Sequence, residues 1–307
     1  MVEKAKHIWM DGELIPWEEA NVHVMTHSLH YGVGVFEGIR CYERADGRRA
    51  IFRLREHIRR LLDSAKIATM EVPYDIDTLC EACVELVRAN GLRSCYLRPI
   101  IFMGDGVMGL GAMNVPIRTA IIAWNWGAYL GEEGLQNGIK TKISSFTRGG
   151  VNSVMARAKM TGQYVNSVLA KREALMSGYD EAILLDAQGF VSEGSGENIF
   201  AIRDGVVRTT PTSSSILAGI TRDTVIHILQ EEGVQLINGR MTRDDLYIAD
   251  ELFLTGTAAE ITPIRSVDER PIGAGKPGAI TRMVQERYFD LVRGGATDHA
   301  EWLALVD

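Results

Sequence analysis

The stretch Ser192-Glu193-Gly194-Ser195-Gly196-Glu197-Asn198-Ile199-Phe200 places two carboxylates, an amide and two glycines between the apolar runs Ala182–Asp186 and Asn198–Ile202. Glycines allow the backbone to approach a ligand closely. Carboxylates beside apolar strands are costly to desolvate and therefore need a strong partner. An ordinary polar hairpin turn explains an isolated pattern of this kind equally well. Other segments of the chain are needed to distinguish an ordinary turn from a binding site.

Two such segments favour a binding site. Lys159 lies upstream in Ala156-Arg157-Ala158-Lys159-Met160, and Gly219-Ile220-Thr221-Arg222-Asp223 downstream has the pattern of a helix start. Small and apolar neighbours favour the neutral amine of Lys159, the form that Schiff-base chemistry requires. Alone, such a lysine is more often a surface residue with a buried stem. An amine, a carboxylate and a helix terminus in this order suggest a site for pyridoxal phosphate.

Three segments carry groups suited to an anion. The first N–H groups of the helix after Gly219, with the Thr221 hydroxyl, suit a phosphate, although an ordinary threonine N-cap has the same pattern. Gly256-Thr257-Ala258-Ala259 follows an apolar run and offers backbone N–H groups to a second anion. Arg60 has Arg59 as its neighbour on an expected helix, so one of the two faces away from the apolar side, and either could be a plain surface charge.

Composition excludes several classes of protein. The 307 residues include 33 basic and 40 acidic side chains, for a net charge of −7, without a block of like charge. Nucleic acid and anionic membranes are therefore not expected as partners. No run approaches the roughly 18 apolar residues of a membrane span, and the first ten residues lack the apolar region of a signal peptide.

The cysteines and histidines do not form a metal-binding pattern. Cys80 and Cys83 make a CxxC motif, but they fall on an expected helix, and no second CxxC or histidine pair completes a site. We interpret the cysteines as buried apolar residues, which fits a reducing cytoplasm. His23, His27 and His30 lack acidic or cysteine partners at ligand spacing and are expected to be structural. No metal is expected.

Helix-period and strand-period patterns alternate irregularly along the chain. Turns at Gln188-Gly189 and Asp204-Gly205 predict two hairpins. The other expected strands are 7–10, 13–15, 34–42, 49–53, 94–103, 118–126, 139–146, 251–255 and 260–267, and the expected helices are 54–68, 76–90, 162–177, 221–232, 242–248 and 278–292. Strands arrive in hairpins as often as separated by helices, so we predict an α+β fold with mixed or antiparallel sheets rather than a doubly wound parallel sheet.

Glycines at 127, 131, 134 and 138 indicate a connector between two domains. We predict a small N-terminal α/β domain at residues 1–127, a linker at residues 128–138, and a larger C-terminal domain at residues 139–307 that carries Lys159.

Read together, these segments resemble the fold-type IV pyridoxal phosphate enzymes and, within them, the branched-chain amino acid aminotransferases. The resemblance runs from His7 to about Arg270. The matching stretches are His30-Tyr31-Gly32-Val33-Gly34-Val35-Phe36-Glu37-Gly38-Ile39-Arg40, the helix with His57, Arg60 and Leu61, Tyr96-Leu97-Arg98-Pro99, Ala158-Lys159 with Tyr164, Glu193 to Asn198, Gly219 to Arg222, and Gly256 to Ile261. The resemblance implies a two-domain fold whose larger domain is a pseudo-barrel.

The resemblance also implies how the cofactor is held. Lys159 would bind pyridoxal 5′-phosphate covalently and later move the proton between Cα and C4′, while the cofactor cycles with pyridoxamine 5′-phosphate. Glu193 would pair with the pyridine nitrogen, and Tyr164 with the ring 3′-oxygen. The phosphate and ring face would be held by Arg60, Leu217, Gly219, Ile220, Thr221, Gly256 and Thr257.

Substrate recognition is implied in the same way. One pocket would take the aliphatic side chain of leucine, isoleucine or valine, and also glutamate or 2-oxoglutarate. Tyr96 with the Thr257 and Ala258 amides would bind the α-carboxylate, and Arg98, helped by Tyr31 of a neighbouring subunit, the distal carboxylate. Phe36, Gly38, Trp126, Tyr129 and Tyr164 would line the pocket, closed by Leu110 of that subunit. A homo-oligomer follows, at least a dimer, with a hexamer as the larger alternative.

Other activities stay open. A related transaminase acting on D-amino acids or primary amines would share the fold, but the Tyr96 and Arg98 pair argues against it. A lyase that cleaves aminodeoxychorismate would use the same lysine and phosphate groups and release pyruvate. A carrier that kept the fold without turnover is the alternative that is not an enzyme.

Overall fold

The computed structural model describes residues 3–127, 129–295 and 298–307; residues 1, 2, 128, 296 and 297, which fall within the predicted domains and linker, lie outside the described residues. The chain folds as two compact units. The first comprises Met1–Trp126, Ala158–Tyr164 and Leu291–Asp307, and the second comprises Gly127–Arg157 and Val165–Asp290. Both units are therefore discontinuous in sequence, and the linear domain boundaries predicted above stay a proposal.

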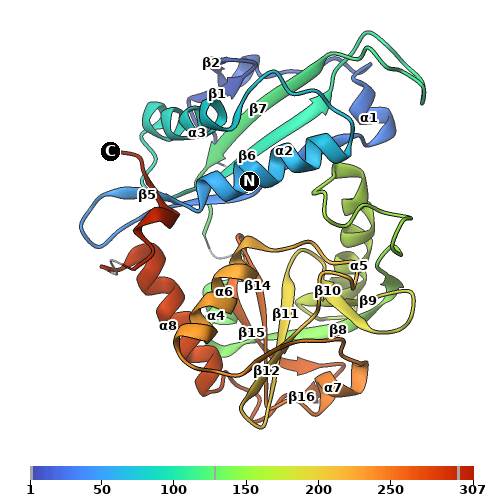
Figure 1. The fold of residues 1–307 in the computed structure, drawn as a ribbon, viewed down its shortest axis with the longest axis vertical. Coiled ribbons are helices and arrows are strands. Elements are labelled where there is room, and N and C mark those ends of the chain that lie inside the picture. Colours follow the sequence, from blue (N-terminus) through green and yellow to red (C-terminus); the bar gives the residue numbers. More distant parts are fainter. Residues whose placement is uncertain (1–2, 128, 296–297) are drawn as a thin grey trace. The chain divides into compact units, whose positions relative to one another are not determined.

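The first unit is built on an antiparallel sheet. Its strand order is β17-β5-β4-β6-β7-β1-β2, and β3 pairs with β6 beside this path. The strands are β1 (His7–Met10), β2 (Glu13–Pro16), β3 (Gly34–Phe36), β4 (Ile39–Glu43), β5 (Arg49–Phe52), β6 (Cys95–Met103), β7 (Ile117–Trp124) and β17 (Leu303–Leu305). The C-terminal strand β17 thus completes the sheet that the N-terminal strands begin (Figure 1).

Two amphipathic helices pack against this sheet. α2 (Leu54–Ile67) and α3 (Ile76–Asn90) bury apolar side chains at helical spacing, and their buried residues join those of the strands in one core (Figure 1). α3 begins after Asp75, whose side chain accepts a hydrogen bond from Thr78 N, and ends at Gly91 in the left-handed conformation. The remaining helical segments here are η1 (Trp17–Glu19), α1 (His27–Tyr31), η2 (Thr161–Gln163) and η3 (Ala300–Trp302).

The predicted strand at residues 34–42 is interrupted. β3 ends at Phe36 and β4 begins at Ile39, although both pair with β6. At the break, Glu37 N donates to Pro99 O at 2.8 Å, and the carboxylate of Glu37 binds side chains of α2. The strand is interrupted because the Glu37 side chain turns to its partners on α2. The prediction of one continuous strand over residues 34–42 is therefore wrong at Glu37 and Gly38.

The second unit contains a mixed sheet in the order β10-β9-β8-β15-β14-β11-β12-β13, with β16 paired to β15. Its strands are β8 (Ile139–Thr147), β9 (Glu181–Leu185), β10 (Val191–Gly194), β11 (Asn198–Arg203), β12 (Val206–Thr209), β13 (Leu236–Asn238), β14 (Glu251–Gly256), β15 (Glu260–Val267) and β16 (Arg270–Pro271). β8 pairs parallel with β9 and β15, whereas β9–β10 and β11–β12 are the two predicted hairpins. The α+β fold with mixed and antiparallel sheets is confirmed.

Helices accompany the sheet of the second unit. They are α4 (Glu132–Asn137), α5 (Tyr164–Met176), α6 (Ile220–Glu231), α7 (Arg243–Tyr247) and α8 (Ala279–Arg293). The glycine-rich segment predicted as a plain connector therefore contains the short helix α4. Gln285 of α8 donates to Leu135 O and Ile261 O, both at 2.9 Å, which ties that helix to α4 and β15.

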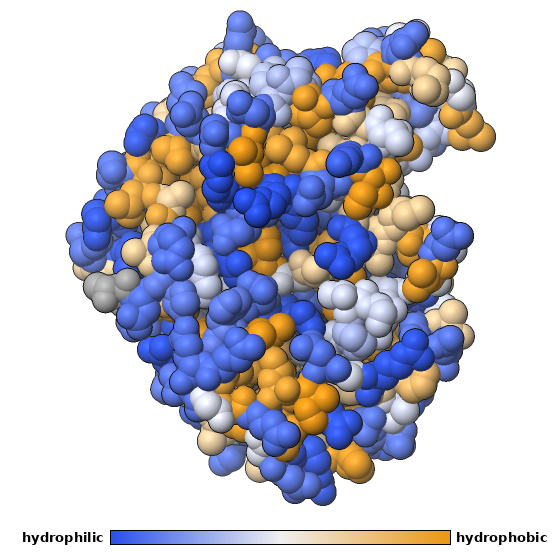
Figure 2. Space-filling model, in the orientation of Figure 1, coloured by the Kyte–Doolittle hydropathy of each residue, from blue (hydrophilic) through white to orange (hydrophobic). Residues whose placement is uncertain are grey.

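Several apolar side chains stay at the surface of the described residues. Leu110 and Met113 are each 90% exposed, and Val24 is 73% exposed. Figure 2 shows apolar patches among the hydrophilic side chains of the face in view. Within the described part of the chain, no helix is long and apolar enough to cross a membrane.

Candidate active site

Both main-chain polar groups of Lys159, the N–H and the carbonyl, form hydrogen bonds. Its N–H donates to Ser64 Oγ at 3.0 Å, and its carbonyl accepts from Phe36 N at 3.0 Å. The next residue, Met160, forms a bridge with Val35 of β3. The Lys159 Nζ atom donates to the Tyr164 hydroxyl at 2.5 Å and lies 4.8 Å from the centre of the Phe36 ring. The amine is therefore aimed at an aromatic hydroxyl rather than at bulk water, unlike a surface lysine.

Arg60 is bound by a buried carboxylate. Glu37 accepts from Arg60 Nε at 2.6 Å and from Nη2 at 2.9 Å, and its second oxygen also lies 2.7 Å from His57 Nδ1. Burial alone would raise the pKa of Glu37, but the charge of Arg60 and the contact with His57 hold this pKa well below its usual range. Burial lowers the pKa of His57. Arg59, the neighbour, is exposed, so Arg60 is the arginine that faces the interior.

An aromatic cage surrounds Arg98 on β6. The Arg98 guanidinium carbon lies 4.6 Å from the Phe36 ring centre and 5.5 Å from that of Tyr96. Tyr96 in turn packs edge-on against Trp126, with ring centres 4.6 Å apart. Although the Arg98 Nε atom is buried, it has no hydrogen-bond partner within the described residues. A buried guanidinium N–H without a partner is costly, and a carboxylate is the group that best satisfies it.

The position of Tyr96 requires a glycine at residue 38. A Cβ atom on Gly38 would lie 1.8 Å from the Tyr96 hydroxyl oxygen, well inside van der Waals contact. The absence of a side chain at Gly38 therefore leaves room for the Tyr96 hydroxyl, next to the interruption between β3 and β4. Eight of the predicted site residues of the first unit are linked through contacts with Phe36, Tyr96 or Glu37; they are Phe36, Gly38, Arg60, Tyr96, Arg98, Trp126, Lys159 and Tyr164.

Three predicted substrate residues lie apart from this group. Tyr31 is 38% exposed, and its ring centre lies 4.5 Å from that of His27 and 6.3 Å from that of His30. Leu110 lies in the exposed segment between β6 and β7. Tyr129, in the second unit, is 38% exposed, and Lys171 Nζ lies 5.4 Å from its ring centre. Their predicted roles stay predictions.

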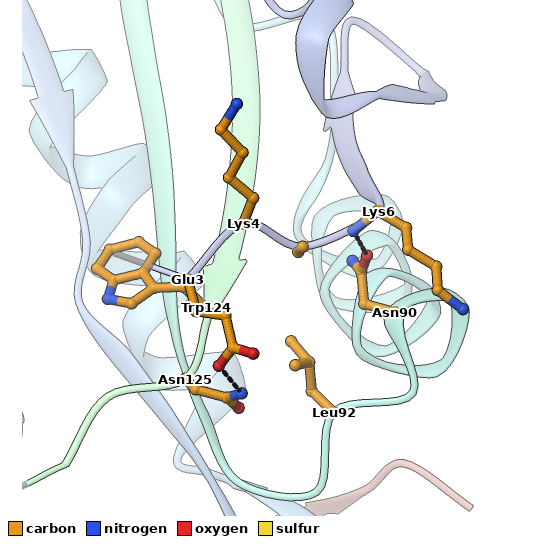
Figure 3. Close-up of a pocket in the computed structure, with 8 residues that line it drawn as sticks. Glu3, Lys4, Lys6, Asn90, Leu92, Trp124 and Asn125 are labelled. Atoms are coloured by element: carbon orange, nitrogen blue, oxygen red, sulfur yellow. Dashed lines mark hydrogen bonds between the residues drawn. The ribbon is translucent and has the colours of Figure 1, made fainter. Parts of the chain in front are cut away.

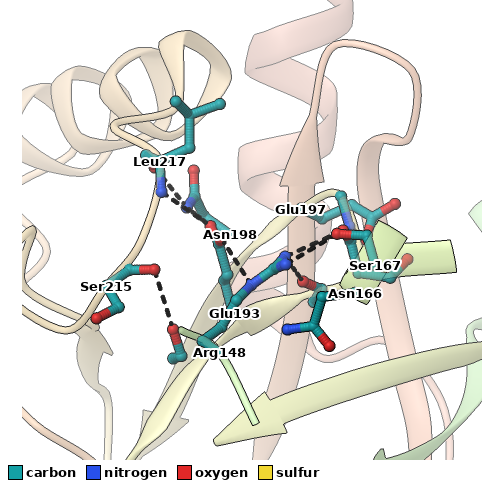
Figure 4. Close-up of polar contacts among 12 residues, drawn as sticks. Arg148, Asn166, Ser167, Glu193, Glu197, Asn198, Ser215 and Leu217 are labelled. Carbon is teal, nitrogen blue, oxygen red and sulfur yellow. Dashed lines mark hydrogen bonds and ion pairs between the residues drawn. The ribbon is translucent and has the colours of Figure 1, made fainter. Parts of the chain in front are cut away.

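Glu193 forms the centre of a buried polar cluster in the second unit (Figure 4). One carboxylate oxygen lies 3.1 Å from Arg148 Nε, and the other accepts from Asn198 Nδ2 at 3.1 Å and from Leu217 N at 3.2 Å. Arg148 also donates to Ser167 Oγ at 2.8 Å. The carboxylate is therefore fixed in place and compensated by a cation, as a buried acid requires.

Asn198 joins this cluster to the start of α6. Its amide nitrogen also donates to Leu217 O at 2.9 Å, and a Cβ atom on Gly219 would lie 2.0 Å from its Oδ1 atom. Gly219 is the N-cap residue of α6, and Ile220 and Thr221 form the first turn. The alternative of a threonine N-cap is therefore wrong, because a glycine without a side chain precedes the helix. Such a terminus suits an anion.

The turn Gly256-Thr257-Ala258-Ala259 connects β14 to β15 and lies beside Gly196 and Glu197, in the turn between β10 and β11. A Cβ atom on Gly256 would lie 3.4 Å from the Glu197 Cγ atom and 3.5 Å from Gly196 O. Thr262 Oγ1 donates to Ala259 O at 2.7 Å and closes the turn. The structure thus brings together Glu193, Leu217, Gly219 and Gly256 in one region of the second unit.

Sequence patterns missed several supporting residues. Glu37 binds Arg60 and also contacts His57, and Ser64 binds the main chain of Lys159. Arg148 and Asn198 bind Glu193. The sequence motifs contain Glu37 and His57 but assign no role to either residue. The signal for Glu37 was its charge inside an apolar strand pattern, since a buried carboxylate needs a cation nearby. Arg148 carries no comparable local signal.

The histidines and cysteines lie outside these clusters. His27 Nε2 is 3.1 Å from Gly109 O and His30 Nε2 is 2.8 Å from Val24 O, so both stabilise backbone segments, as expected of structural residues. Cys41, Cys80, Cys83 and Cys95 are free thiols. Among the described residues, no group of three histidine, cysteine, aspartate or glutamate side chains is placed to hold a metal ion.

A surface pocket of about 240 Å³ lies beside the N-terminal segment of the first unit (Figure 3). It is lined by Glu3, Lys4, Ala5, Lys6, Asn90, Leu92, Trp124 and Asn125. None of the predicted site residues lines it.

Residues 34–267 match the amino-transferase class IV family, and the chain belongs to that family. The chain is 54% identical over 306 residues to the branched-chain-amino-acid aminotransferase of Pseudomonas aeruginosa, covering 100% of this chain and 99% of that protein. The crystal structure of the branched-chain amino acid aminotransferase of Escherichia coli is similar at a TM-score of 0.97 and 47% identity, covering 99% of this chain and 100% of that one.

A third relative carries the cofactor in its structure. The branched-chain amino acid aminotransferase of Thermobaculum terrenum, solved in its PLP form, is similar at a TM-score of 0.92 and 37% identity, covering 99% of each chain. The resemblance inferred from the sequence motifs is therefore confirmed, and so is the fold-type IV architecture.

Proposed function

We propose that this chain is a pyridoxal phosphate-dependent aminotransferase that exchanges the amino group of L-leucine, L-isoleucine or L-valine with 2-oxoglutarate. The products are the branched-chain 2-oxo acids and L-glutamate. The observation that carries the proposal is the Lys159 amine, held 2.5 Å from the Tyr164 hydroxyl beside the ring of Phe36, which also packs on Arg98. The names of the full-length relatives support the same reaction.

The residues of the first unit fit the cofactor chemically. Lys159 supplies the primary amine for the covalent link to the cofactor aldehyde, and Tyr164 supplies a hydroxyl for the ring oxygen. Arg60, which Glu37 orients, is proposed to bind the phosphate. The PLP form of the Thermobaculum terrenum relative supports the same cofactor here.

The residues of the second unit fit the polar ends of the same molecule. Glu193, whose oxygens are fixed by Arg148, Asn198 and Leu217, is proposed to bind the protonated pyridine nitrogen. The start of α6 at Gly219, Ile220 and Thr221, together with the Gly256 and Thr257 turn, is proposed to bind the phosphate, and Leu217 to pack on the ring.

The proton transfer is assigned to Lys159. When bound, pyridoxal phosphate supplies the electron sink that acidifies the substrate Cα. We propose that the Lys159 amine takes the proton from Cα and returns it to C4′, which requires a neutral amine close to both atoms. The main-chain hydrogen bonds of Lys159 with Ser64 and Phe36 fix the backbone position from which the lysine side chain extends. The Tyr164 hydroxyl lies 2.5 Å from the Lys159 amine.

Arg98 is proposed to explain the dual substrate range. Its Nε, which has no hydrogen-bond partner among the residues that the structure describes, suits the distal carboxylate of glutamate. The rings of Phe36, Tyr96, Trp126, Tyr129 and Tyr164 suit an aliphatic side chain. Tyr96, Thr257 and Ala258 are proposed to bind the α-carboxylate, and Gly38 to make room for Tyr96. Because glutamate binds Arg98 through its distal carboxylate and leucine does not contact it, one pocket accepts both substrates without a large rearrangement of its side chains.

A homo-oligomer is proposed because exposed apolar residues gather at the predicted subunit contacts. Leu110 and Met113 are 90% exposed and Leu29 is 64% exposed, which is unusual for large apolar side chains on a monomer. Tyr31 and Leu110 are proposed to serve a partner's substrate pocket, in at least a dimer, with a hexamer as the larger alternative. Sedimentation of the purified protein tests the assembly: a monomer at micromolar concentration contradicts it.

A cytoplasmic location is proposed as well. Cys41 and Cys95 are partners on the adjacent strands β4 and β6 and are free thiols, which suits a reducing compartment. Cell fractionation tests the location, and recovery of the protein outside the cytoplasmic fraction contradicts it.

A half-reaction tests the proposed activity. Purified protein with pyridoxal phosphate should show the absorbance of the lysine-bound cofactor, and L-leucine alone should convert it to the pyridoxamine form. Reaction with a D-amino acid but not with L-leucine would identify a different transaminase. Release of pyruvate from aminodeoxychorismate without a 2-oxo acid acceptor would instead identify a lyase, and no spectral change with any of these would identify a carrier.

A further inference from the structure

We propose that Ser64 is a positioning residue for Lys159, because its hydroxyl connects the main chain of that lysine to the helix that carries Arg60. This inference rests on the proposed function for the role of Lys159, but not for the contact itself.

The Ser64 hydroxyl makes two hydrogen bonds in opposite senses. It accepts from the Lys159 N–H at 3.0 Å and donates to the Arg60 carbonyl oxygen at 2.7 Å. Ser64 is completely buried, so water does not replace either partner. A hydroxyl that both accepts and donates is oriented by its donated bond, because its hydrogen points at the Arg60 carbonyl and leaves a lone pair for Lys159.

This connection joins residues that are far apart in sequence. Ser64 and Lys159 are separated by 95 positions, and the hydroxyl links Lys159 to one turn of α2, the turn that presents Arg60. The Arg60 side chain is held by the buried Glu37 carboxylate at 2.6 and 2.9 Å. Phe36, the residue before Glu37, donates its N–H to the Lys159 carbonyl at 3.0 Å. A closed circuit of hydrogen bonds and covalent links therefore runs through Lys159, Ser64, Arg60, Glu37 and Phe36.

The circuit fixes the base of the lysine side chain relative to Arg60. Proton transfer depends steeply on the distance and angle of the base, so a small displacement of the Lys159 main chain lowers turnover more than substrate binding. The hydrogen bonds of the Ser64 hydroxyl are with main-chain atoms of Lys159 and Arg60, not with the Lys159 amine. Ser64 therefore acts through the Lys159 main chain.

Hydrogen exchange at the Lys159 amide tests the contact without any assay of activity. In the wild-type holoenzyme this amide should be protected as strongly as amides of the neighbouring strands. In Ser64→Ala, exchange at Lys159 should rise about tenfold or more beyond the change in the α2 amides, because one buried hydrogen bond is lost. An unprotected Lys159 amide in the wild-type protein overturns the inference even if the variant does not fold.

Ser28 provides a matched control in the same unit. Its hydroxyl accepts from Met103 N at 2.9 Å and donates to Val33 O, the same two kinds of contact, but does not involve Lys159. Ser28→Ala should lower stability comparably without changing exchange at Lys159. Equal exchange at Lys159 in Ser64→Ala and Ser28→Ala contradicts a positioning role.

Kinetics separate positioning from general loss of stability. Ser64→Ala should lower kcat about tenfold with little change in KM for L-leucine, and Ser64→Thr, which keeps the hydroxyl, should recover most of that loss. A rise in KM alone, or no recovery with threonine where it folds as well as alanine, overturns the inference. Borohydride reduction of the wild-type holoenzyme tests the proposed function separately from the role of Ser64. If Lys159 is not labelled, the proposed function fails. The hydrogen-exchange result still tests the Ser64–Lys159 hydrogen bond in that case.

Discussion

Glu37 binds Arg60 through both of its carboxylate oxygens, at 2.6 and 2.9 Å, in the interior of the first unit. One of these oxygens also lies 2.7 Å from His57 Nδ1. The carboxylate therefore holds two side chains of α2 at the break between β3 and β4. This relationship decides how the proposed phosphate-binding arginine is presented.

Replacing Glu37 by glutamine should destabilise the protein strongly. The change leaves the buried Arg60 cation without its counter-charge, and breaking one side of a buried pair costs about 3–5 kcal/mol. Urea unfolding of the cofactor-free protein measures the loss. Glu18→Gln is the control, because Glu18 and Lys4 form an exposed pair 2.8 Å apart that contributes about 0–1 kcal/mol. Equal losses in the two variants would contradict the buried pair.

The same pair predicts an acid-sensitive contribution to stability. The pKa of Glu37 is lowered in the folded state, so its contribution is present above pH 4.5 and is lost as the pH falls below that value. The free energy of unfolding of the wild type should therefore fall more steeply below pH 4.5 than that of Glu37→Gln. Parallel curves for the two proteins between pH 5 and pH 3 would show that the carboxylate is not ionised in the fold.

Glu197 predicts the opposite dependence on pH. Burial, and then the neighbouring Glu181 carboxylate, raise the pKa of Glu197 to about 8. Because this pKa lies above the ordinary value of 4.5, the folded state binds the proton more tightly. The stability that depends on this proton is full below pH 4.5 and is lost as the pH rises towards 8.

Glu197→Gln should remove this loss. The variant should match the wild type near pH 4.5 and exceed its stability at pH 9 by a few kcal/mol, at about 1.4 kcal/mol per pH unit crossed. Urea unfolding of the cofactor-free protein at both pH values measures the difference. Glu13→Gln, at an exposed strand position, controls for the removal of a carboxylate from the surface. A variant less stable than the wild type at pH 9 would contradict a protonated Glu197.

Gly38→Ala should displace Tyr96. The added Cβ atom would lie 1.8 Å from the Tyr96 hydroxyl, and the Tyr96 ring cannot move freely because it packs against Trp124 and Trp126. We expect a destabilisation of about 1–3 kcal/mol and a higher KM for amino acid substrates. Gly295→Ala is the control, since a Cβ atom there meets no atom of the described residues within 4 Å. Unchanged kinetics in Gly38→Ala would exclude Tyr96 from substrate binding.

Arg98→Met should separate the two half-reactions. Loss of the guanidinium should weaken the reaction of L-glutamate about 10- to 100-fold in kcat/KM, because a charged hydrogen bond is removed. The reaction of L-leucine should change much less, since it places an aliphatic group in the cage. Stopped-flow measurement of both half-reactions on one preparation makes each substrate the control for the other. Equal losses for both would contradict the role of Arg98.

The sequence predicted best those features whose causes are local. The hairpins at Gln188-Gly189 and Asp204-Gly205 follow from turn residues, and the end of α3 follows from Gly91. The contact of Lys159 with Tyr164 joins residues five positions apart, within one motif. For the same reason, the family could be inferred from short motifs in the correct order.

Contacts between distant segments were not predictable in the same way. Arg148 and Glu193 are separated along the chain by η2, α5 and β9, and neither residue shows in its own surroundings that it pairs with the other. The break between β3 and β4 depends on partners that α2 provides, so the apolar pattern of residues 34–42 concealed it. The first helical residue of α6 also differed from the expected position, because Gly219, rather than a threonine, precedes the helix.

Identification of the residue that carries the cofactor tests the central claim most directly. The holoenzyme is reduced with borohydride, digested, and mapped by mass spectrometry, and the mapping is repeated on Lys159→Ala. We predict that the reduced cofactor is attached to Lys159 in the wild type, that the variant carries no attached cofactor, and that L-leucine added before reduction prevents the attachment. Attachment to any other lysine, or equal labelling of Lys159→Ala, would contradict the account.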